Sequence, residues 1–124
     1  MPVVFWIEDK DSPSSGLSGM QVMAVAGAPV SPVMLQRRIV GRLFEDRTAI
    51  HCVLGDLRPD HPDRSPKIQA RETFQRMDDA LAAAGMAFPD VVRTWFYLRD
   101  ILSWYGEFNS VRSSFYRKKK VWGK

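Results

Sequence analysis

The sequence predicts one α+β domain in which a sheet has two helices packed on one of its faces. Two stretches, residues 70–84 and 104–115, repeat apolar side chains at helical spacing, and between them residues 91–98 (VVRTWFYL) are rich in β-branched and aromatic types. Each helix has a single apolar stripe to bury, so the simplest arrangement covers one face of a sheet with both. A chain of 124 residues is long enough for one hydrophobic core.

The N-terminal half predicts the other strands. Residues 3–9 (VVFWIED) and 20–26 (MQVMAVA) are apolar and β-branched, and the loop between them, residues 12–19, consists almost entirely of turn-forming types. Residues 45–47 predict a turn. Residues 48–54 then alternate as a half-buried strand does, and Gly55 ends it.

Both helices have recognisable boundaries. Ser65-Pro66 offers a capping hydroxyl followed by proline at the first helical position, and Gly85 is suited to a left-handed C-terminal cap. Between them one stripe is formed by Ala70, Phe74, Met77, Leu81 and Ala84. The stripe of the second helix is formed by Trp104, Phe108, Val111 and Phe115.

Composition narrows the class of protein. No stretch resembles a signal peptide or a membrane span, and one cysteine favours a reducing compartment, so we expect a cytoplasmic protein with no membrane partner. Residues 117–124 carry a charge of +5. The rest of the chain has 13 basic and 14 acidic side chains, so the net charge of the whole chain is +4. The basic character belongs to a tail, and nucleic acid is an unlikely partner.

Several side chains have an ordinary structural interpretation. Cys52 is expected to be a small buried hydrophobe, and the adjacent Asp78 and Asp79 a solvated face. His51 and His61 lack other ligands at metal spacing, and we predict no metal and no cofactor. The densest aromatic group is expected to be mostly core, with a cleft wall or a subunit interface as the alternative; it comprises Trp95, Phe96, Tyr97, Trp104 and Tyr105.

With these elements placed, residues 40–116 resemble the Rid (YjgF-like, endoribonuclease L-PSP-like) family. The resemblance is strongest over DVVRTWFYLRDILSWYGEFNSVRSSFY, residues 90–116, and its WFYL…WYGEFN variant is also similar to a chorismatase-like branch. It implies a chorismate-mutase-like fold, a homotrimer, and small carboxylate or imino-acid ligands bound between subunits. Residues 1–39 would be an N-terminal extension and residues 117–124 a basic tail.

The resemblance also implies ligand-binding positions. Asn109 matches an asparagine near the family's ligand cleft, and Gly55 matches the glycine that ends the strand at the cleft floor. Asp100 matches an aspartate whose expected role is to cap the second helix. Candidates to receive a carboxylate are Arg93, Arg99 and Arg112, although each could be an ordinary surface arginine. No catalytic residue is assigned.

Departures from the family pattern predict weak or absent imine hydrolysis. Leu43 and Leu54 stand where deaminases have tyrosine and serine, and the segment with the carboxylate-anchoring arginine has no counterpart after Tyr116. The expected function is therefore a Rid-like small-ligand domain with little or no deaminase activity. A non-catalytic carboxylate-binding or assembly domain is the alternative, and RNA binding or ribonuclease activity a third.

The same comparison implies that the family's C-terminal strands are absent, which leaves a sheet edge to cover. Either the strands predicted at residues 3–9 and 20–26 cover it, or RKKKVWGK is the scar of a truncated or frame-shifted reading frame.

Overall fold

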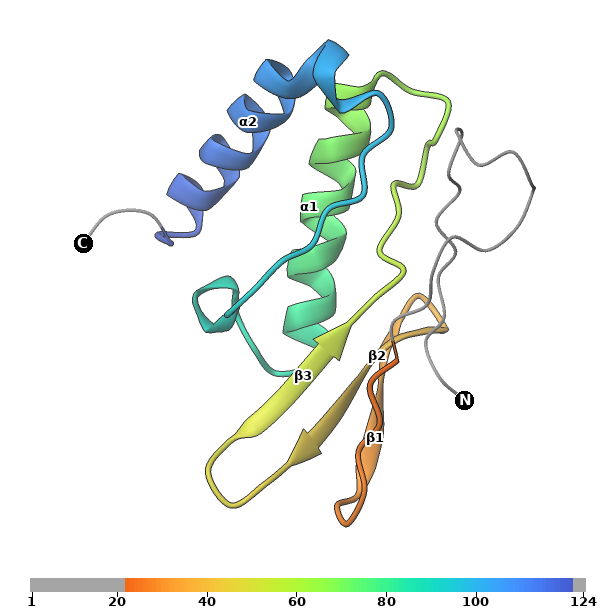
Figure 1. Cartoon of the computed structure of the whole chain (residues 1–124), viewed down its shortest axis with the longest axis vertical. Helices are drawn as coiled ribbons and strands as arrows, with labels where there is room; N and C mark the ends of the chain where they lie inside the picture. Colours follow the sequence, from red (N-terminus) through yellow and green to blue (C-terminus); the bar gives the residue numbers. More distant parts are fainter. Residues whose placement is uncertain (1–21, 122–124) are drawn as a thin grey trace.

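The computed structural model describes residues 22–121 and shows an α+β arrangement consistent with the YjgF-like fold (Figure 1). Three antiparallel strands form a sheet in the order β1-β2-β3, and two helices lie beside it. This confirms the predicted fold class. The elements are β1 (Val30–Leu35), β2 (Arg38–Glu45), β3 (Ile50–Leu54), α1 (Pro66–Ala83), the short 3-10 helix η1 (Phe88–Asp90) and α2 (Ile101–Lys118).

Helix α1 lies between the sheet and α2. On one side Ala80 is fully buried against Val33 of β1 and Val40 of β2. On the other side Phe74 is in contact with the aromatic rings of α2, and Figure 1 shows α2 on the side of α1 away from β1. The molecule therefore has two small cores with α1 shared between them.

The aromatic core is centred on Phe74, which is only 1% exposed. Its ring centroid lies 5.0 Å from that of Phe115 and 5.3 Å from that of Phe96. Phe108 stacks on it from the middle of α2. The predicted apolar stripes thus meet at this cluster, and tilted or edge-on ring pairs of this kind stabilise a core beyond their buried area.

Close approach of the strands requires glycine at position 41. Gly41 pairs with Leu54 across β2 and β3. A Cβ atom there would lie 2.6 Å from both Leu54 Cδ2 and the carbonyl oxygen of Val53, closer than real Cβ atoms come to other heavy atoms. Gly41 therefore lets the Leu54 side chain sit over β2 and join both cores.

The boundaries of α1 agree with the prediction, with one difference in chemistry. Pro66 is the first helical residue, and Gly85 adopts the expected left-handed conformation with φ of 71°. The Ser65 hydroxyl, however, makes no capping hydrogen bond. Instead the Ser65 carbonyl accepts from the backbone N–H groups of Ile68 and Gln69.

Two predicted strands are not formed. Residues 93–98 alternate outward and inward, whereas Val92 is 99% exposed and departs from the pattern. The segment joins no ladder, because a strand needs a neighbour and the described strands pair only with each other. Residues 22–26 also lack strand structure; their small alanines offer little surface for cross-strand packing. Residues 3–9, and with them the first part of the 20–26 prediction, lie outside the described residues.

Candidate functional site

Helix α2 presents two buried polar atoms that have no hydrogen-bond partner. They are Oδ1 of Asn109, which matches an asparagine near the family's cleft, and Nε of Arg112, one of the candidate carboxylate receivers. Their positions, three apart on the helix, make them neighbours on one face. A buried polar atom without a partner loses about 1–3 kcal/mol of solvation that nothing replaces. Such atoms therefore call for a structural or functional explanation.

The face that holds Asn109 and Arg112 borders the apolar stripe of α2. Phe108 and Val111, the residues just before them, are buried in the helix core. The Arg112 guanidinium lies over the Phe108 ring, with Cζ 5.8 Å from the ring centroid. This contact holds the arginine stem against the helix, so the position of its Nε is fixed by packing.

Gly55 does not offer its backbone amide to a ligand. Its N–H donates to the carbonyl of Val40 at 2.8 Å, which extends the β2–β3 pairing by one residue. The adjacent Leu54, where deaminases have serine, packs against both cores. Leu43, the other departure from the deaminase pattern, also faces the sheet core. These two positions are therefore structural in this chain.

Arg93 lies in a different place from Asn109 and Arg112. It is exposed on the extended segment, and its guanidinium Cζ lies 5.5 Å from the centroid of the Trp95 ring. A small pocket beside it includes Thr94 and Tyr116 but neither Asn109 nor Arg112. Of the four predicted binding residues, Asn109 and Arg112 share a face of α2, Gly55 uses its amide in the sheet, and Arg93 lies on the extended segment before α2.

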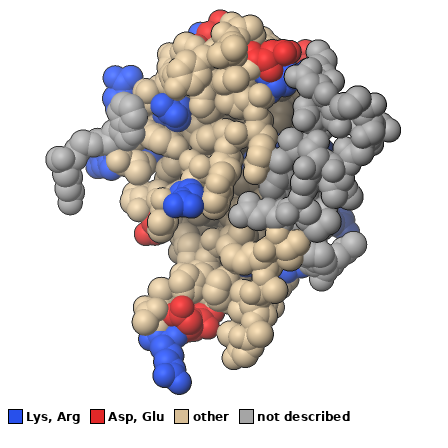
Figure 2. Space-filling view, viewed as in Figure 1, with Lys and Arg blue, Asp and Glu red and all other residues tan. Residues whose placement is uncertain are grey.

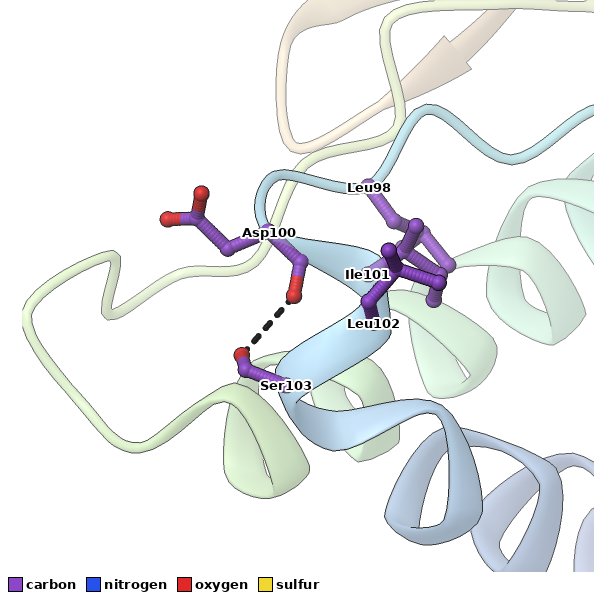
Figure 3. A pocket seen from close by; sticks show the side chains of 5 residues that line it. All are labelled: Leu98, Asp100, Ile101, Leu102 and Ser103. Carbon is purple, nitrogen blue, oxygen red and sulfur yellow. Dashed lines mark hydrogen bonds between the residues drawn. The ribbon is translucent and has the colours of Figure 1, made fainter.

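Asp100 does not cap α2 through its side chain as predicted. It adopts a left-handed backbone conformation with φ of 47°, and only its carbonyl is used, accepting from the backbone N–H and the hydroxyl of Ser103. Figure 3 shows its carboxylate pointing away from the aliphatic side chains of the adjoining depression, Leu98, Ile101 and Leu102. Without a polar group aimed into it, this depression is a poor ligand site.

Two ion pairs join elements that the sequence did not connect. Asp78, expected to be solvated, pairs with Lys119 of the basic run, and both side chains are about one-quarter exposed. Arg76 on α1 is buried and pairs with Asp60 in the loop after β3, while its Nη1 also donates to Gln36. Arg76 lies 16 residues from Asp60 and 40 residues from Gln36 in the sequence, so no local sequence pattern predicted these contacts.

The described side chains whose pKa values are clearly shifted do not lie on α2, so these shifts do not favour acid–base chemistry there. Hydrogen bonds from Thr48, with those from His51 and Ala49, hold the pKa of Asp46 far below its usual range. The His61 ring lowers the pKa of Glu72, and burial raises the pKa of the Cys52 thiol. Among the described residues, no group of three metal-ligating side chains is brought together.

The aromatic group predicted to be core is divided between core and surface. Phe96 and Trp104 pack against the helix core. Trp95, Tyr97 and Tyr105 are each more than half exposed. The core prediction is therefore correct for Phe96 and Trp104, and the other three residues are on the surface of the single chain.

The face of the molecule seen in Figure 2 shows no broad basic patch. In Figure 2 the cationic side chains over the helices are separate from one another, and most of the visible surface is uncharged. No helix of residues 22–121 has the length and hydropathy needed to cross a membrane.

Comparison with known proteins places this arrangement in a family. The family model described as endoribonuclease L-PSP matches residues 58–122, just over half of the chain and most of the region in which the resemblance was strongest. No curated protein and no solved structure matches significantly. The matched region includes both helices, the extended segment, Asn109 and Arg112. The chain belongs to the endoribonuclease L-PSP (YjgF/Rid) family.

Proposed function

We propose that this protein binds small carboxylates that bear a hydrogen-bond donor beside the carboxyl group, with little or no turnover. The observation on which the proposal depends is the unpartnered pair on α2, one acceptor and one cationic donor. An imino acid, an amino acid or an aminobenzoate has the complementary pair. Its N–H would donate to Asn109 Oδ1, and its carboxylate would accept from Arg112.

The energetics favour such a ligand over water. The Arg112–carboxylate bond is charge-assisted and forms where the Phe108 ring excludes solvent from one side, so it contributes about 1.5–3 kcal/mol. The Asn109 bond adds about 1 kcal/mol and removes the cost of a buried, unpaired oxygen. Two such bonds to a ligand of a few heavy atoms support affinities in the micromolar to millimolar range.

Hydrolysis of an imine needs a group that activates water as well as a carboxylate anchor. The pKa values of two carboxyl groups, Asp46 in the β2–β3 turn and Glu72 on α1, are lowered mainly by hydrogen bonds from Thr48 and His61 respectively, and neither group lies on α2. Leucine replaces the polar side chains of deaminases at positions 43 and 54. These features support binding more than catalysis.

Two measurements separate the binding function from a deaminase. The first is calorimetric titration with 2-aminobenzoate, where we expect saturable binding, about 2- to 10-fold weaker binding of benzoate, and about 10- to 100-fold weaker binding by Arg112→Gln. Arg112→Lys should not restore affinity because lysine lacks the Nε donor. The second is ammonia release from freshly generated 2-iminopropanoate. We expect the rate of buffer alone, and a clearly faster rate would make the protein a deaminase instead.

We also propose that the protein associates with copies of itself through the outer face of the sheet. On that face, opposite α1, the exposed strand residues are apolar: Val30, Met34, Ile39 and Val53. Apolar side chains on a sheet face are buried when a second sheet packs on them. Sedimentation velocity should show a homotrimer, the state implied by the family. Met34→Glu should shift it toward monomer, and a wild-type monomer at micromolar concentration would refute the proposal.

A further inference from the structure

Residues 91–98 form an extended segment with a regular outward face. Figure 1 shows the chain running across the helices between η1 and α2. Phe96 and Leu98 face inward and pack against the helix core. Every second side chain faces outward and is exposed, and these are Arg93, Trp95, Tyr97 and Arg99. At strand spacing, this order places two aromatic side chains between two arginines on one surface.

Among residues 22–121, no strand pairs with the backbone of this segment. Val91 begins it in extended conformation, with φ of −74° and ψ of 117°. Within the described part of the chain, no backbone hydrogen bond joins residues 92–96 to any other residue. An exposed extended backbone with free donors and acceptors is a template on which another strand can pair.

We propose that this segment is a docking site for an extended acidic peptide, which binds by adding a strand. The peptide backbone would pair with residues 92–96, and its outward side chains would lie beside those of the segment. Acidic residues would meet Arg93 and Arg99, and β-branched residues would pack on Trp95 and Tyr97. Because the order arginine, aromatic, aromatic, arginine is the same in both directions, a parallel or an antiparallel peptide fits.

The contacts favour a peptide over single-stranded nucleic acid. The Arg93 guanidinium lies over Trp95, so one face of that ring is already covered and less open to a base. Arg99 Nε lies 3.7 Å from the Asp100 carboxylate, which weakens its attraction for any anion, so Arg93 contributes more of the charge recognition. Nucleic acid would also leave the backbone groups of residues 92–96 without partners, whereas a strand satisfies them.

The test is fluorescence anisotropy of the full chain with a labelled peptide of sequence Glu-Thr-Val-Thr-Val-Thr-Glu. We expect saturable binding that Arg93→Glu weakens by at least about 10-fold, since it replaces attraction with repulsion. Arg71→Glu, an equally large charge change at an exposed position of α1, should leave binding unchanged. A peptide with proline in place of the central threonine should bind poorly, because its ladder N–H is missing.

Three outcomes would overturn the proposal: no binding of the acidic peptide, equal effects of the Arg93 and Arg71 variants, or binding of oligouridylate in preference to the peptide. Hydrogen exchange adds an independent check, since strand addition should slow exchange of the amides of residues 92–96 and leave α2 unchanged. Asn109→Leu should not alter peptide binding. Failure of this proposal is therefore distinguishable from failure of small-carboxylate binding.

Discussion

Helices α1 and α2 have the same length, 18 residues, but are used in different ways. Helix α1 is buried on two sides, with Ala80 against the sheet and Phe74 against α2. Helix α2 buries a single stripe and leaves Asn109 and Arg112 with unpaired polar atoms at its border. Helix α1 keeps an exposed edge with Arg71 and Gln75, and its own unpartnered buried atom, Nε of Arg76, belongs to a side chain that is already paired with Asp60 and Gln36. We therefore assign core stability to α1 and propose binding at α2.

The largest expected effect is on α1. Phe74→Ala should lower the free energy of unfolding by about 3–5 kcal/mol, because it opens a cavity among four aromatic rings that pack on Phe74. Tyr105→Ala on the exposed side of α2 should change it by less than about 0.5 kcal/mol. Urea unfolding of both variants makes the comparison, and similar losses would contradict the different roles of the helices.

A smaller effect is expected in the sheet that α1 covers. Gly41→Ala should cost about 1–3 kcal/mol, since the new Cβ meets Leu54 Cδ2 and the Val53 carbonyl and forces the strands apart. Gly106→Ala is the matched control on α2. Nothing lies within 4 Å of a Cβ at Gly106, and alanine favours a helix by up to about 1 kcal/mol. The melting temperature should fall for Gly41→Ala and rise for Gly106→Ala.

For a substitution at Asn109 on α2 we predict higher stability together with weaker ligand binding. Asn109→Leu removes the buried unpaired oxygen and should raise the free energy of unfolding by about 1 kcal/mol while weakening 2-aminobenzoate binding. Gln75→Leu on α1 replaces an exposed side chain that is paired with Asp79, and we expect no gain. If Asn109→Leu instead lowers the free energy of unfolding, the unpaired oxygen of Asn109 does not destabilise the folded protein. That result would contradict the view that the oxygen is kept for binding at the expense of stability.

The smallest expected effect is a loss of stability at low pH, when Asp46 and Glu72 become protonated. The pKa values of Asp46 and Glu72 are lowered in the folded protein, mainly by hydrogen bonds from Thr48 and His61 respectively. Each contribution is therefore complete above the ordinary pKa values of 3.8 and 4.5 and is lost as pH falls through the lowered folded values. Glu72→Gln should flatten the decline in melting temperature below about pH 4.5. The exposed Glu107→Gln on α2 should not.

Local patterns predicted the helices well, because the 3.6-residue period and the boundary residues Pro66 and Gly85 act within a few positions of each other. The alternation expected in residues 91–98 holds from Arg93 onward, whereas Val92 is fully exposed. The prediction that residues 91–98 form a strand failed. A strand needs a pairing partner elsewhere in the chain, and the composition of a segment does not show whether that partner exists.

The candidate site was predicted in part for the same reason. Asn109 and Arg112 lie on one helix, so their shared face follows from spacing alone. Arg93 and Gly55 belong to other segments, so their positions relative to that face depend on the fold and do not follow from spacing. The Arg76–Asp60 and Lys119–Asp78 pairs join residues far apart in the sequence. A charged residue has many possible partners, and composition does not choose among them.

Binding at α2 is tested most directly by the melting temperature of three proteins with and without 2-aminobenzoate. A ligand that binds only the folded state raises the melting temperature, and the rise grows with the logarithm of the ratio of ligand concentration to Kd once that ratio is large. We predict a rise for the wild-type chain and none for Asn109→Leu or Arg112→Gln, although Asn109→Leu should begin from a higher value. An equal rise in all three proteins would place the ligand elsewhere and contradict the assignment of binding to α2.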